Sequence, residues 1–138
     1  MKKIYFAGSI RGGRQDVETY RKLINELSKH HIVLTEHLGS EELGELGEFE
    51  ISDVEIFNRD LAWIREADVV IAEVTTPSLG VGYELCYAEF MRKKIICIYR
   101  QRTSRYLSAM VSGNRYVDII LYDDMEIIPR LLKEIDNL

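Results

Sequence analysis

Two acidic residues lie among apolar residues on predicted helices, where a carboxylate needs a partner or a purpose. Glu84 follows a Gly-Val-Gly turn and shares a helix face with Val81 and Ala88, and Asp60 borders the apolar face of an earlier helix. Paired carboxylates in different environments are what glycosidic chemistry uses, one as nucleophile or ion-pair partner and the other to handle the protons of the leaving group. For an isolated Asp60, a salt bridge to a nearby arginine is the alternative.

A tyrosine and a glycine-rich segment extend this candidate site. Tyr5, at the end of the first apolar run, could donate its hydroxyl to the nucleophile, although an aromatic residue in a strand is more often core. The segment GSIRGG, residues 8–13, precedes a predicted helix, so its backbone N–H groups can point at an anion. It matches neither the dinucleotide nor the Walker pattern, and Arg11 adds a charge suited to one terminal phosphate. A tight turn that merely needs small residues is an equal alternative.

Other polar residues give weaker signals. Ser9, Ser78 and Ser108 supply hydroxyl donors, and each could equally be a helix cap or a loop serine. The histidines form no metal-ligand set with the carboxylates at a recognised spacing, so neither a metal nor a cofactor is expected. Cys86 and Cys97 are lone residues in apolar runs and are expected to be reduced and buried.

Five short runs rich in β-branched and aromatic residues predict the strands that position these groups. They are KIYFAG, IVLTEH, DVVIAEV, KIICIYR and VDIILYD. Helices are predicted over 15–30, from Ser52 with a capping box completed by Glu55, from near Val81, from near Ser104, and over 125–135. Near-continuous apolar strands that alternate with helices indicate a parallel sheet covered on both faces. The prediction is a single α/β domain over 1–138, doubly wound around a five-stranded parallel sheet.

In such a sheet, ligands bind beyond the carboxyl ends of the strands, near the switch point of strand order. The acidic, glycine-punctuated segment 38–50 is interpreted as a loop that could close over a ligand, or equally as a solvated loop without a role. A net charge of -5 gives no reason to expect a nucleic acid polymer or an anionic membrane as partner, so any phosphate must be held locally. No run reaches the length of a membrane span or of a secretory signal, and a cytoplasmic protein is expected.

Four segments together resemble a known family. YFAGSIRGGR, LTEH, DLAWIREADVVIAEVTTPSLGVGYEL and RYLSAM, in this order over residues 5–110, are similar to the 2'-deoxynucleoside 5'-phosphate N-hydrolases of the nucleoside 2-deoxyribosyltransferase superfamily. The resemblance implies a flavodoxin-like homodimer. It also implies cleavage of the N-glycosidic bond of 2'-deoxynucleoside 5'-monophosphates, which yields free base and 2-deoxyribose 5-phosphate.

The resemblance also implies roles for individual residues. Glu84, on the first turn of its helix, attacks the anomeric carbon, Asp60 assists at the base and Tyr5 lies beside the nucleophile. Gly80 and Gly82 let the backbone approach the ligand closely. The implied substrate and phosphate contacts are Gly8, Ser9, Ile10, Arg11, Gly12, Gly13, His37, Ser78 and Gly80, with Ser108 and Met110 reaching into the neighbouring subunit's site.

Three other functions use similar residues. A nucleoside 2-deoxyribosyltransferase would use the same glutamate but has no need of a phosphate cradle. A ribonucleotide N-glycosidase of the CMP type shares the scaffold. A non-catalytic nucleotide sensor would need the phosphate loop but not the inward carboxylates Asp60 and Glu84. The resemblance leaves both purine monophosphates and 5-hydroxymethyl-deoxyuridine monophosphate open as substrates.

Overall fold

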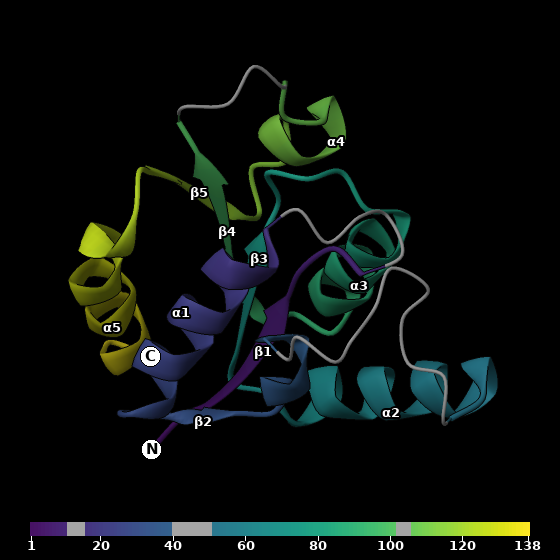
Figure 1. Ribbon diagram of the computed structural model, residues 1–138. Helices are drawn as coiled ribbons and strands as arrows, with labels where there is room; N and C mark the ends of the chain where they lie inside the picture. Colours follow the sequence, from purple (N-terminus) through teal and green to yellow (C-terminus); the bar gives the residue numbers. More distant parts are fainter. Residues whose placement is uncertain (11–15, 40–50, 102–105) are drawn as a thin grey trace.

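The computed structural model describes residues 1–10, 16–39, 51–101 and 106–138, and its strands form one parallel sheet (Figure 1). The strands are β1 (Lys3–Ala7), β2 (Ile32–Val33), β3 (Val69–Glu73), β4 (Lys94–Arg100) and β5 (Asp118–Tyr122). All five predicted strands are confirmed. Their order, β2-β1-β3-β4-β5, is that of flavodoxin-like folds, in which the chain switches direction between β1 and β3.

Helices cover both faces of this sheet (Figure 1). On one face lie α1 (Val17–Ser28) and α5 (Ile128–Asp136), and on the other lie α2 (Asp53–Glu66) and α3 (Leu79–Phe90). The short elements are α4 (Ala109–Ser112) and the 3-10 helices η1 (Glu36–Gly39) and η2 (Met125–Ile127). Among the residues described, no helix has the length and apolarity to cross a bilayer.

Alternation along the strands produces two separate cores. Ile4 and Phe6 of β1 pack with the residues of α1 and α5, whereas Tyr5 and Ala7 pack with those of α2 and α3. The same alternation places Ile71 of β3 and Ile96 of β4 in the first core, and Val70 and Ile95 in the second. Tyr5 is thereby turned toward the helices that carry Asp60 and Glu84.

Serine caps decide where two helices begin. Ser52 Oγ accepts from the Glu55 N–H at 3.2 Å, which confirms the predicted start of α2. Ser78 Oγ accepts from the Val81 N–H at 3.3 Å, so α3 begins at Leu79. The predicted start near Val81 is therefore too late.

The start predicted for the fourth helix is wrong. It begins at Ala109, after a cap by Ser108, and residues 106–108 are not helical. Ser104 itself lies outside the described residues, as do Gln15 and residues 40–50 of the predicted closing loop.

Two further expectations need correction. In the run IVLTEH only Ile32 and Val33 are strand, because the Thr35 side chain takes over the pairing: its Oγ1 accepts from Phe6 N–H at 2.9 Å and donates to Phe6 O at 2.7 Å. Cys97 is buried as predicted, but Cys86 is exposed. The buried, sheet-facing positions of α3 include Leu85 and Ala88, and Cys86 points away from them.

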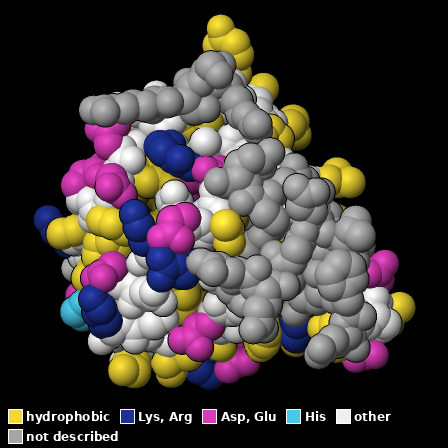
Figure 2. Space-filling model, in the orientation of Figure 1, with side chains coloured by type: hydrophobic (Ala, Val, Ile, Leu, Met, Phe, Trp, Pro, Cys, Tyr) yellow, Lys and Arg dark blue, Asp and Glu magenta, His cyan; other side chains and the backbone are white. Residues whose placement is uncertain are grey.

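The surface carries both charged and hydrophobic side chains. Acidic and basic side chains are interspersed over α1 and α5, and hydrophobic side chains project around α4 (Figure 2). The exposed apolar residues of that region include Tyr106 and Met110.

Candidate active site

Tyr5 and Glu84 meet at the carboxyl end of the sheet, although 79 positions separate them in the sequence. The Tyr5 hydroxyl donates a hydrogen bond to Glu84 Oε2. Tyr5 is 1% exposed, held between the strands and α3, so its hydroxyl has a fixed direction. The contact predicted from the sequence is present, and it orients one oxygen of the carboxylate.

The environment of Glu84 favours its protonated form. Burial raises the pKa of Glu84 to about 7, the Tyr5 hydrogen bond acts in the opposite direction, and the charge of Asp60 raises the pKa further. Burial likewise raises the pKa of Tyr5, with added contributions from Glu84 and Asp60, so Tyr5 stays a hydrogen-bond donor. A carboxyl group with a pKa near 7 can ionise at neutral pH and act as a nucleophile.

The position of Glu84 on α3 differs from the expectation. Because Ser78 caps the helix, Gly80 and Gly82 fall within its first turn and Glu84 lies beyond that turn. A methyl group built on Gly80 would stand 4.0 Å from Glu84 Oε1, whereas one on Gly82 would meet nothing within 4 Å. A methyl group at either position would meet at most ordinary van der Waals contacts within the chain, so packing does not require these glycines, and the close approach of a ligand stays a prediction.

Asp60 pairs with Arg59, so the salt bridge to a nearby arginine that the sequence left open for this carboxylate is present, and Arg59 is a candidate site residue that the sequence reasoning did not name. Its Nε donates to Asp60 Oδ1 at 2.9 Å, its Nη2 lies 3.4 Å from His37 Nε2, and its guanidinium carbon lies 4.6 Å from the centre of the Trp63 ring. The charge of Arg59 also opposes the rise in the pKa of Tyr5. Side chains of adjacent helix residues normally point in different directions, so an arginine next to a carboxylate in the sequence is a weak signal of pairing.

In the pH profile of kcat/KM, Arg59→Gln is expected to shift the acid limb to higher pH. The change removes a positive charge that favours the ionised groups of the Tyr5, Asp60 and Glu84 cluster. The loss of activity should be several-fold at pH 6 and smaller at pH 8, as measured by kcat/KM across that range. Arg59→Lys keeps the charge and is the control. An unchanged profile in Arg59→Gln would contradict this role.

The structure describes only part of the predicted phosphate loop: Gly8, Ser9 and Ile10 are described, and Arg11, Gly12 and Gly13 lie outside the described residues. The Ser9 N–H donates to the Tyr20 hydroxyl at 3.0 Å, so this backbone donor is already used. A methyl group on Gly8 would lie 2.9 Å from the Tyr20 ring, which is a packing reason for glycine there.

Ser78 and Ser108 both act as N-caps, the alternative that the sequence left open. A capping hydroxyl accepts a hydrogen bond from the helix, so its own proton stays able to bind a phosphate oxygen. Capping therefore does not exclude a substrate contact by either serine.

Ser108 and Met110 are not brought to Glu84 within one chain. Both are exposed and line a groove of about 610 Å³ between α3 and α4, whose lining includes Ser78 but not Tyr5, Asp60 or Glu84. In the part of the chain that the structure describes, no group of three His, Cys, Asp or Glu side chains could hold a metal ion.

Comparison with known proteins identifies the family of this chain. Residues 4–126 match the family model described as nucleoside 2-deoxyribosyltransferase. A protein of Tetraodon nigroviridis named 5-hydroxymethyl-dUMP N-hydrolase is 53% identical over 112 residues, which cover 80% of this chain and 79% of that protein. The Homo sapiens protein of the same name is 50% identical over 111 residues, covering 80% of this chain and 64% of that protein.

A solved structure shares the fold. The CMP N-glycosidase of Clostridium botulinum superposes with a TM-score of 0.63 at 20% identity and covers 96% of this chain and 99% of its own. The fold and the resemblance predicted from the sequence are thus confirmed, and the chain belongs to the nucleoside 2-deoxyribosyltransferase family.

Proposed function

We propose that this protein hydrolyses the N-glycosidic bond of 2'-deoxynucleoside 5'-monophosphates to free base and 2-deoxyribose 5-phosphate. The observation that carries the proposal is the hydrogen bond from Tyr5 to Glu84, a half-buried carboxyl group with a raised pKa next to Asp60. Relatives at about half identity are named 5-hydroxymethyl-dUMP N-hydrolase, which supports the same substrate class.

The reaction proceeds in two displacements. The ionised Glu84 oxygen forms a bond to the anomeric carbon as the bond to the base nitrogen breaks, and the electron pair leaves with the base. Asp60, in its protonated form, donates a proton to the departing base and becomes a carboxylate. Water then attacks the anomeric carbon of the glycosyl ester, its proton passes to Asp60, and Glu84 is released as a carboxylate, the pattern of retaining glycosidases. A missing 2'-hydroxyl favours this route because positive charge develops more easily at the anomeric carbon.

The 5'-phosphate and the base of the substrate are recognised by different segments of the chain. Residues 8–13 and Ser78 take the 5'-phosphate, with Arg11 as its main charge. His37, with Arg59 and Trp63 beside it, lies near Asp60 and suits the base end. Recognition of the phosphate favours hydrolysis of nucleotides over base exchange between unphosphorylated nucleosides.

The test is chromatography of the protein with deoxyguanosine monophosphate, 5-hydroxymethyl-deoxyuridine monophosphate, cytidine monophosphate and deoxyguanosine, each with and without an acceptor base. Release of free base from a deoxy-monophosphate, without an acceptor, is the expected result. Base exchange on the nucleoside would support a transferase instead, and cleavage of only the ribonucleotide would contradict the 2'-deoxy assignment. No reaction with any of them would favour a nucleotide sensor.

We also propose that the active protein is a homodimer in which Ser108 and Met110 complete the neighbouring subunit's site. The support is their exposure beside an apolar groove that also contains Leu79, which is itself 94% exposed. Apolar surface of this kind favours burial against another chain.

Ser108→Trp is expected to lower kcat/KM at least tenfold while the thermal midpoint of the protein stays within a few degrees of the parent's. The indole would fill the space that the partner's substrate needs, but Ser108 is exposed within its own chain. Sedimentation velocity and kinetics on the same samples provide the measurement. Arg115→Trp, at an exposed position outside the groove lining, is the control. Unimpaired kinetics in Ser108→Trp would reject the shared site.

A further inference from the structure

A second buried polar cluster lies on the face of the sheet opposite Tyr5 and Glu84. Side chains alternate along β3, so Glu73 projects toward the α1 and α5 side, as Ile71 does. Glu73 is 0% exposed; its Oε2 accepts from the Tyr122 hydroxyl at 2.5 Å and its Oε1 from the Thr75 N–H at 2.6 Å. The proposed reaction does not use this carboxylate, and a charge buried this completely needs partners.

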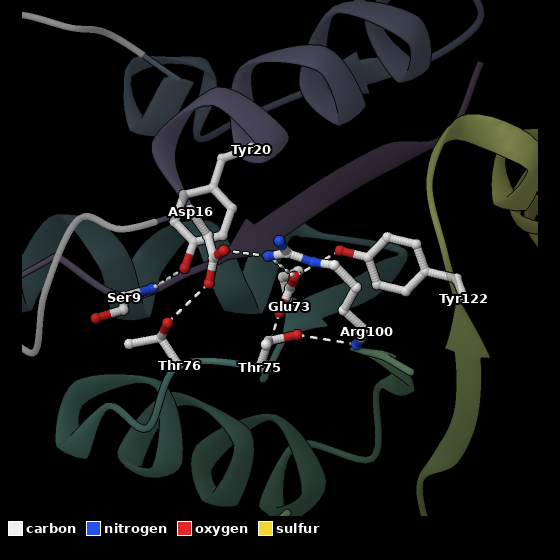
Figure 3. Close-up of polar contacts among 8 residues, drawn as sticks. All are labelled: Ser9, Asp16, Tyr20, Glu73, Thr75, Thr76, Arg100 and Tyr122. Atoms are coloured by element: carbon white, nitrogen blue, oxygen red, sulfur yellow. Dashed lines mark hydrogen bonds and ion pairs between the residues drawn. The ribbon is translucent and has the colours of Figure 1, made fainter. Parts of the chain in front are cut away.

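Arg100, at the end of β4, links Glu73 to Asp16 (Figure 3). Its Nη2 lies 3.8 Å from Glu73 Oε2 and forms an ion pair with Asp16 Oδ1, and its backbone N–H donates to Thr75 Oγ1 at 2.9 Å. One guanidinium therefore faces two carboxylates. Its charge is compensated by these two carboxylates, so Arg100 connects β3, β4 and the start of α1 at this end of the sheet.

Asp16 stands just before α1, where an aspartate usually caps the helix. Its side chain makes no cap hydrogen bond. Instead, Oδ2 accepts from Thr76 Oγ1 at 2.7 Å and Oδ1 pairs with Arg100, so both oxygens point away from the helix (Figure 3). Asp16 is 7% exposed, and its carboxylate thus ties the start of α1 to the loop that follows β3.

Ser9, near the end of the described residues 1–10, is also held by a buried group. The Ser9 N–H donates to the hydroxyl of Tyr20, which is fully buried on α1 (Figure 3). The Tyr20 N–H in turn donates to the Asp16 backbone oxygen at 2.9 Å. Ser9 and Asp16, on the two sides of residues 11–15, are therefore both bound by buried groups.

We propose that Asp16 is a positioning residue for recognition of the 5'-phosphate, an inference that rests on the function proposed above. Its bonds to Thr76 and Arg100 hold the start of α1 against the turn that leads to Ser78 and α3. Ser9 and Ser78, two of the proposed phosphate contacts, are both tied to this region, Ser9 through Tyr20 of α1 and Ser78 as the cap of α3. Anion recognition by backbone donors depends on their being held in place before the ligand arrives. The chemical step depends on Tyr5 and Glu84, which lie on the opposite face of the sheet.

Asp16→Asn tests this role, because the amide keeps the shape and an acceptor for Thr76 but loses the charge that pairs with Arg100. The KM for the monophosphate and the inhibition constant of inorganic phosphate should each rise about tenfold, which is a weakening of about 1.4 kcal/mol. The kcat at saturation should change less than about threefold. Neither the KM nor the phosphate inhibition constant depends on the fraction of protein that is folded, so partial unfolding cannot imitate the result.

Thr76→Val is a second variant that removes one hydroxyl and leaves every charge in place. A rise of a few-fold in the same two constants is expected. Asp118→Asn is the matched control, because it breaks the pair with Lys94 at the opposite end of β4 and should leave both constants unchanged.

Arg11→Ala separates this inference from the proposed function. If Arg11→Ala raises the KM and the phosphate inhibition constant while Asp16→Asn and Thr76→Val do not, the positioning role is wrong and phosphate recognition stands. If Arg11→Ala leaves both constants unchanged as well, the phosphate assignment itself is wrong. A fall in kcat alone in Asp16→Asn, with unchanged KM and inhibition constant, would also overturn the positioning role.

Discussion

Glu84→Gln should lower kcat by on the order of 10⁴-fold or more, because the amide keeps the size of the side chain but cannot form the bond to the anomeric carbon. Binding of the monophosphate, measured by calorimetry, should change less than about fivefold. Glu66→Gln, on the exposed end of α2, is the control, since its pair with Lys3 is at the surface and contributes little. A kcat within tenfold of the parent would reject Glu84 as the nucleophile.

The same variant should be more stable than the parent at pH 8. The folded-state pKa of Glu84, about 7, lies above the ordinary value of 4.5, so between these pH values the folded protein holds a proton that the unfolded chain has released. The stability contributed by the neutral carboxyl is therefore present at low pH and is lost as the pH rises through 7. The cost of ionisation is on the order of 3 kcal/mol, from about 1.4 kcal/mol for each pKa unit.

Denaturant unfolding at pH 5 and pH 8 measures this effect. The advantage of Glu84→Gln should grow between the two pH values, and the activity of the parent should rise over the same range as the carboxylate forms. An advantage of equal size at both pH values would contradict the pKa assignment. The expected result would mean that the protein keeps the Glu84 carboxylate at a cost in stability.

Asp60→Asn should lower kcat/KM by roughly 10² to 10³-fold for substrates whose base must be protonated to leave. The loss should be less than about tenfold for a synthetic 2-deoxyribose 5-phosphate whose leaving group departs without a proton. The contrast follows from the proposed role of Asp60, which acts on the leaving group and not on the attacking oxygen. Equal losses for both substrates would reject the proton role.

The pH profile gives an independent check on Asp60. Its negative charge raises the pKa of Glu84, so Asp60→Asn should move the acid limb of the residual activity toward lower pH. Arg59→Gln is expected to move the limb the other way. Shifts in the same direction in the two variants would contradict the electrostatic description of the site.

Local patterns in the sequence determined the strands and the cap of α2. Apolar runs of β-branched residues and the Ser52–Glu55 box act over a few residues, so the sequence carries that information directly. The carboxylates Asp60 and Glu84 could also be recognised from the sequence, since each borders an apolar helix face. Local reasoning was less successful at the start of α4 and for Cys86, where helix position relative to the sheet decides exposure.

Only the tertiary structure decided which of these groups meet. The parallel order β1-β3-β4 brings Tyr5 to Glu84 across 79 positions and Arg100, at the end of β4, to Asp16 across 84. The sequence predicted a helix over 15–30, which includes Asp16, whereas in the structure Asp16 precedes α1 and its ion pair with Arg100 directs the carboxylate away from the helix. Strand alternation then separates the two clusters onto opposite faces, because successive side chains must point to opposite sides of a pleated sheet.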